Sequence, residues 1–135
     1  MRISMKSGYV EFDNEGTVEF QNAVAKLPFD FIDLSSGFYN IDKRLIYPAR
    51  PDVLDERLHE SVAIGARNPS QSFIISGKAF LNSWRGMPAN LHPGLCRDLI
   101  ANPNFLREAG NGCKNRGKCH YYSRGEKHIT CGMWQ

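Results

Sequence analysis

Short apolar runs separated by turn residues fill the first two thirds of the chain, a pattern typical of a mixed α+β body. Apolar residues within 3–5 and 9–12 predict two short strands around Ser7-Gly8. A short helix that ends at Pro28 is expected next. Three apolar residues recur there at helical spacing after Thr17, namely Phe20, Val24 and Leu27.

The segment after Pro28 predicts further strands and the clearest helix of the chain. Residues 29–34 alternate as a strand, and residues 38–47 are typical of a hairpin. Asp52 is expected to cap the helix, whose apolar stripe consists of Leu54, Leu58 and Val62. Residues 72–76 predict a buried strand. The predicted fold class is therefore α+β, a small mixed body of short strands, hairpins and one or two helices.

Turn residues between 84 and 94 mark a boundary in the chain. We expect an α+β body over 1–88 and a Cys/His-rich basic module over 89–135, either as two domains or as one continuous domain. Residues 95–100 predict a helical stretch, and Asn102 followed by Pro103 predicts the start of a second short helix. The rest of this module is rich in loops, and a bound metal is expected to hold it together.

Composition favours a cytoplasmic protein. A chain of 135 residues with a hydrophobic fraction of 41% can bury a core without cross-links. Its first residues contain no apolar signal run, and no window approaches the roughly 20 apolar residues of a membrane helix. We therefore expect a cytoplasmic location, in the host cytoplasm if the source is viral. Thiols stay reduced in that compartment, which favours metal ligation over disulfide bonds.

All four cysteines lie within the last forty residues, with histidines between them. Clustered thiol and imidazole groups predict a metal centre, with disulfides or unligated thiols as the alternatives. Two ligand sets fit the spacing. Both contain Cys113, Cys119 and Cys131, and the fourth ligand is either Cys96 or His128. The set with His128 is typical of a zinc knuckle, whereas the set with Cys96 suits either zinc or a [4Fe–4S] cluster.

Charge is distributed unevenly along the chain. Residues 1–60 carry 11 acids and 7 bases, whereas residues 61–135 carry 3 acids and 10 bases. The basic half predicts binding to nucleic acid or to an acidic protein surface. The candidate contacts are five bases and two tyrosines: Lys114, Arg116, Lys118, Arg124, Lys127, Tyr121 and Tyr122. The same bases would also offset the negative charge of metal-bound thiolates, and the tyrosines would then pack beside the metal.

Four short motifs follow one another along the final third of the chain: Cys96-Arg97-Asp98, Pro103-x-Phe105, Cys113-x5-Cys119 and Gly132-Met133-Trp134. This order resembles the iron–sulfur segment of WhiB-like transcriptional regulators. Gly110 stands where that family has a further cysteine, so Cys131 would have to supply the missing thiolate. The resemblance implies a [4Fe–4S] cluster and docking onto the transcription machinery, with DNA contact through the nearby bases.

These features favour a small accessory or regulatory protein that uses a metal centre for structure and its basic module for binding. A phage or virion structural or assembly protein stabilised by the metal site is the first alternative. The second is a metal-dependent nuclease, in which histidines such as His92, His120 and His128 would act. Catalysis is the weaker hypothesis, because a closed four-ligand site leaves no open coordination position for a substrate. No catalytic residue is assigned.

Overall fold

A computed structural model describes residues 1–6, 13, 15–36, 51–76, 86–108, 111–114, 131 and 133–134. The chain divides into two compact units, Met1–Gly94 and Leu95–Gln135. The boundary predicted from the turn residues is after residue 88. The intervening residues contain a short strand that belongs to the first unit.

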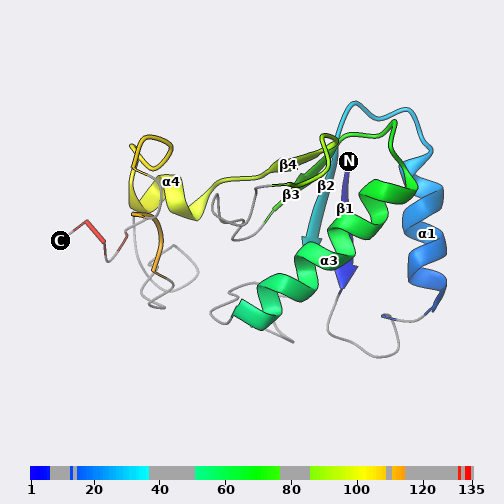
Figure 1. The fold of residues 1–135 in the computed structure, drawn as a ribbon, viewed down its shortest axis with the longest axis horizontal. Helices are drawn as coiled ribbons and strands as arrows, with labels where there is room; N and C mark the ends of the chain where they lie inside the picture. The colour runs from blue at the N-terminus through cyan, green and yellow to red at the C-terminus, as the bar shows by residue number, and fades with distance from the viewer. Residues whose placement is uncertain are drawn as a thin grey trace, which may run out of the picture. The chain divides into compact units, whose positions relative to one another are not determined.

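A four-stranded sheet forms the centre of the first unit (Figure 1). Its strands β1 (Arg2–Lys6), β2 (Ile32–Ser36), β3 (Phe73–Ile75) and β4 (Leu91–Pro93) lie side by side in chain order. Every pairing between them is parallel. The predicted mixture of helices and strands is confirmed. The arrangement in the described residues is α/β with a parallel sheet, however, and not a body of hairpins.

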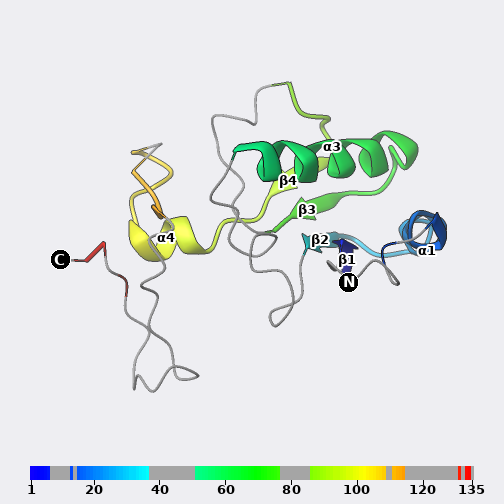
Figure 2. The same ribbon diagram turned by 90° about the horizontal axis from the view of Figure 1, so that it is seen from below.

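Parallel neighbours cannot be joined by a tight turn, so the chain must cross over between one strand and the next. Helix α1 (Glu15–Ala25) makes the first crossover, and helix α3 (Pro51–Arg67) lies within the second. Both helices contact β1 and each other, and α3 also contacts β4. Figure 2 shows α3 running along one side of the sheet. The predicted strand at 9–12 and hairpin at 38–47 lie outside the described residues.

Alternate residues of the strands build the core. Because successive side chains in a strand point to opposite faces, the register sets two apolar rows on the helix side. Ile32, Phe73 and Leu91 face one another across three strands, and Ile3, Leu34 and Ile75 form the next row. All six are buried. Helix residues complete this cluster, with Val24, Ala25 and Ile64 buried against it and Leu58 and Val62 partly buried.

Helix α1 packs differently from its predicted stripe. Val24 is buried, but Phe20 and Leu27 are 61% and 48% exposed. Gln21 is buried in place of Phe20, and its side-chain amide donates hydrogen bonds to the carbonyl oxygens of Ser4 and Met5, each at 3.2 Å. Backbone carbonyls that are shielded from water need a donor. The end of β1 therefore selects a polar side chain where helical spacing predicted an apolar one.

One asparagine fixes the position of β4. The side-chain amide of Asn90 donates to the carbonyl oxygens of Gly65, Asn68 and Gln71 at 3.0–3.2 Å, in the last turn of α3 and just beyond its end. The backbone carbonyl of Asn90 accepts a hydrogen bond from the amide of Phe73 at 2.8 Å. Asn90 thus joins the end of α3 to β3 and β4. The turn residues of this segment predicted a boundary in the chain and gave no signal for the strand.

We expect Asn90→Ala to lower the free energy of unfolding of the first unit by about 1–3 kcal/mol. The substitution removes the side-chain donor of the Gln71 carbonyl and one of two donors from the carbonyls of Gly65 and Asn68. Urea unfolding followed by circular dichroism measures this change. Ser70→Ala, at an exposed turn position beside the same helix end, serves as the control and should change stability little. Equal unfolding midpoints for the Asn90→Ala and Ser70→Ala proteins would contradict this role of Asn90.

Candidate functional site

Helix α4 (Arg97–Ala101) organises the described part of the second unit. It begins directly after Cys96, whose carbonyl oxygen accepts a hydrogen bond from the amide of Ile100 at 2.9 Å. The side chain of Cys96 makes no capping hydrogen bond and is exposed. The first candidate ligand is therefore located at the start of a helix, where its thiol is accessible to solvent.

Asp98 connects this helix to the second candidate ligand. Its side chain is buried, with 3% of the residue exposed, and its Oδ1 accepts a hydrogen bond from the backbone amide of Cys113 at 2.8 Å. Burial of an unpartnered carboxylate would be costly, so this charge-assisted bond stabilises both groups. It holds Cys113 near the beginning of α4, fifteen residues earlier in the chain.

Gly112 makes the approach of Cys113 to Asp98 possible. A Cβ atom at this position would overlap Oδ1 of Asp98 and would lie 2.7 Å from Cε2 of Phe105. Phe105 is itself buried, at 3% exposure. No residue with a side chain fits without displacing the carboxylate or the ring. The glycine before Cys113 is thus required by packing.

Turns connect α4 to this contact, where the sequence analysis expected a second short helix. Asn102 ends α4 in an extended conformation, and its Oδ1 accepts a hydrogen bond from the amide of Asn104 at 2.9 Å. Its side-chain amide donates to Oε2 of Glu108 and to the carbonyl of Asn111. Asn102 therefore bonds both Glu108 and Asn111 to the end of α4. The N-cap pattern was present, but turns at residues 103–107 follow it instead of a helix.

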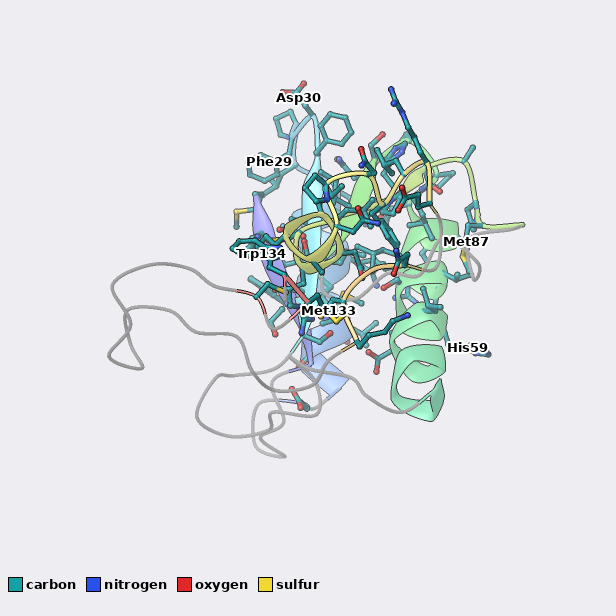
Figure 3. All side chains as sticks on the ribbon, turned by 90° about the vertical axis from the view of Figure 1, so that its left-hand side faces the viewer. Phe29, Asp30, His59, Met87, Met133 and Trp134 are labelled. Carbon is teal, nitrogen blue, oxygen red and sulfur yellow. The ribbon has the colours of Figure 1, made fainter. Side chains whose placement is uncertain are left out.

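The last cysteine also belongs to a segment that is bonded to α4. The backbone amide of Trp134 donates to the carbonyl of Cys131 at 3.0 Å, which forms a turn. The indole Nε1 of Trp134 donates to the carbonyl of Ile100 at 2.7 Å. Trp134 lies beside α4 in Figure 3, although 55% of the residue is exposed. The segments that carry Cys113 and Cys131 are therefore both attached to the helix that follows Cys96.

The described residues contain only part of either predicted ligand set. Cys96, Cys113 and Cys131 are not joined in disulfide bonds. Within the described ranges, no group of three or more His, Cys, Asp or Glu residues is placed to hold a metal ion. Both ligand sets require Cys119, which lies outside the described residues, as does His128. The metal centre and the choice of its fourth ligand remain predictions.

Of the seven residues that were predicted to bind nucleic acid or an acidic protein, one lies in the described part of the chain. Lys114 is exposed beside Cys113. The other six residues lie outside the described part of the chain: Arg116, Lys118, Arg124, Lys127, Tyr121 and Tyr122. The second unit carries seven bases and three acids in its sequence, a net charge of +4. One of these acids is the buried Asp98, so that surface acidity is lower than composition alone indicates.

Of the three histidines that were considered for catalysis, only His92 lies in the described part of the chain. His92 is on β4 in the first unit, and its ring meets that of Phe31 edge-on with 5.9 Å between ring centroids. Its neighbour in the described structure is thus an aromatic ring. His120 and His128 lie outside the described residues. His59 is exposed and points outward from α3 (Figure 3).

No family model, curated protein or solved structure matches the chain. No helix in the described ranges is long and apolar enough to span a membrane.

Sequence reasoning missed Asp98 and Gly112 as site residues. One signal was available for Asp98, which is one of only three acids after residue 60 and is located two positions after a candidate ligand. For Gly112 there was no equivalent signal. Its requirement depends on the approach of two side chains that are distant in sequence.

We expect Gly112→Ala to disrupt the contact between Asp98 and Cys113 and to destabilise the second unit by about 1–3 kcal/mol, because overpacking forces neighbouring groups to shift. Emission from Trp134 in a Trp84→Phe background reports this change, since the indole is bonded to α4. Leu106→Ala removes an exposed side chain from the same unit and serves as the control. Identical denaturation curves for the Gly112→Ala and Leu106→Ala proteins would rule out the packing requirement.

Proposed function

We propose that this chain is a small accessory or regulatory protein that binds nucleic acid, or an acidic surface of the transcription machinery, through its basic C-terminal unit. A structural metal centre built on Cys113, Cys119 and Cys131, with Cys96 or His128 as the fourth ligand, would stabilise that unit. One observation carries the proposal. Helix α4, which follows Cys96, is hydrogen-bonded to both the segment of Cys113 and that of Cys131.

The chemistry of the donors fits such a centre. Thiolate and imidazole groups are the preferred ligands of structural zinc, and four thiolates also bind a [4Fe–4S] cluster. Either group would supply structural cross-linking between the chain segments that carry its ligands. The chain's own residues contribute the thiols, the helix that spaces them and the hydrogen bonds that keep the segments near that helix.

The distribution of charge supports binding to a polyanion. The second unit has a net charge of +4, and Lys114 is exposed directly after the anchored Cys113. Bases that neutralise phosphates release condensed counterions, which gives affinity without sequence specificity. The resemblance to WhiB-like regulators adds the transcription machinery as a partner. Nucleic acid is the first partner to test, because it requires only the charge and the stacking side chains.

Purification without oxygen, followed by metal analysis and a visible spectrum, tests the metal centre. We expect either one zinc ion per chain in a colourless protein or iron and sulfide in a brown one. Cys113→Ser should lower the metal content, because both ligand sets include this thiol, whereas Ser70→Ala should not. Protein that contains no metal and no titratable thiols would instead support disulfide bonds and would refute this centre.

Binding to nucleic acid is tested by a mobility-shift titration at several salt concentrations. We expect the triple variant Lys114→Glu, Arg116→Glu, Lys118→Glu to bind more weakly. The slope of log K against log salt should fall by about 0.9 for each duplex phosphate contact that is lost. Lys26→Glu reverses an exposed base in the first unit and is the matched control. Equal weakening by Lys26→Glu alone would show that the C-terminal bases are not the binding surface.

A further inference from the structure

We infer that Asp98 is a positioning residue of the metal centre, which holds Cys113 at the start of α4 by accepting its backbone amide. This inference rests on the proposed function, since it assigns a role toward the same centre. It adds a residue that is not itself a ligand, and it specifies what that residue does. The acceptor oxygen of Asp98, and not its negative charge, would be the essential feature.

The direction of the hydrogen bond supports this role. An aspartate at the N-cap of a helix accepts a hydrogen bond from an amide of the first turn, and one inside that turn is favoured by the helix dipole. Oδ1 of Asp98 instead accepts from Cys113, 2.8 Å away and fifteen residues later in the chain. The carboxylate therefore connects two segments that both carry candidate ligands, Cys96 two residues before Asp98 and Cys113 itself.

The surroundings of Asp98 keep this contact fixed. The residue is 3% exposed, and the backbone at Gly112 is close enough to it that a Cβ atom would overlap the carboxylate. The buried ring of Phe105 lies against the same glycine. A carboxylate enclosed in this way has few alternative rotamers, so it restrains the backbone of Cys113 before any metal binds. Such restraint lowers the entropy that is lost when the ligands are brought together.

An electrostatic role for Asp98 would act in the opposite direction. A carboxylate near metal-bound thiolates adds negative charge to a site that already carries it, which disfavours the ligated state. The hydrogen bond instead accounts for an acid at this position, because a charged acceptor forms a stronger bond with an amide than a neutral one does. The two roles make different predictions for asparagine, which keeps an acceptor oxygen and loses the charge.

The experiment compares zinc affinity in the full chain, measured by competition with a chromophoric chelator, for Asp98→Ala and Asp98→Asn. Loss of an outer-shell partner of a metal ligand typically lowers metal affinity by about 10–100-fold. We expect a decrease of this size for Asp98→Ala and recovery of most of it for Asp98→Asn. Asp30→Ala and Asp30→Asn are the matched controls, since they alter an exposed acid of the first unit.

Amide hydrogen exchange at Cys113 in the metal-free protein provides the second measurement. Protection should be present in the wild-type and Asp98→Asn chains and lost in Asp98→Ala. Cobalt substitution adds a spectroscopic signature, because the thiolate-to-cobalt absorption reports the geometry of the ligands. A changed cobalt spectrum in Asp98→Ala, restored in Asp98→Asn, would support positioning over a general effect on folding.

The outcomes separate this inference from the function on which it rests. If the wild-type chain binds zinc and Asp98→Ala binds it equally well, the positioning role is refuted and the metal centre stands. If Asp98→Asn loses as much affinity as Asp98→Ala while it remains folded, the acceptor role is refuted. If both variants bind zinc more tightly than the wild-type chain, the carboxylate acts through its charge, and the positioning role is refuted as well. If the wild-type chain binds neither zinc nor iron, the proposed centre fails and the inference fails with it.

Discussion

Parallel pairing in chain order is the constraint on which the first unit depends. Each strand must be followed by a crossover before the next can pair, and right-handed crossovers in a β1-β2-β3-β4 order place their helices on one face. The contact of α1 with α3 agrees with this arrangement. The apolar rows of the sheet face those helices. The strand order therefore determines which face of the sheet the core occupies.

Buried or half-buried polar side chains satisfy backbone groups at the places where this regular pattern ends. Gln21 serves the carbonyls at the end of β1, Asn90 serves those at the end of α3, and Asp98 serves the amide of Cys113. Each of these bonds spans at least fifteen residues of sequence. A shielded backbone group without a partner costs more than a typical hydrogen bond gains, so these three positions determine how segments join.

The sequence predicted the elements better than it predicted their partners. The helix from residue 51 and the strand at 73–75 were found, because periodicity and turn residues are local signals. The parallel pairing was missed, since strand direction depends on which segments meet. Phe20 follows the helical spacing of apolar residues and yet is exposed. Gln21 is buried instead, because its amide bonds to a carbonyl of β1, and no local sequence pattern indicates that contact. In the C-terminal unit the cysteines were evident from the sequence, whereas Asp98 and Gly112 became identifiable only from their contact.

The two units differ in how much of their described structure depends on long-range hydrogen bonds to the backbone and how much on apolar packing. In the first unit such bonds supplement a core in which ten of the described apolar residues are buried. In the second unit, two of the described residues, Ala101 and Phe105, are buried and apolar. Two long-range bonds, from Cys113 to Asp98 and from Trp134 to Ile100, therefore carry a larger share of its order. A unit with so small a described core gains most from a bound metal, because metal ligation supplies folding free energy where apolar burial does not.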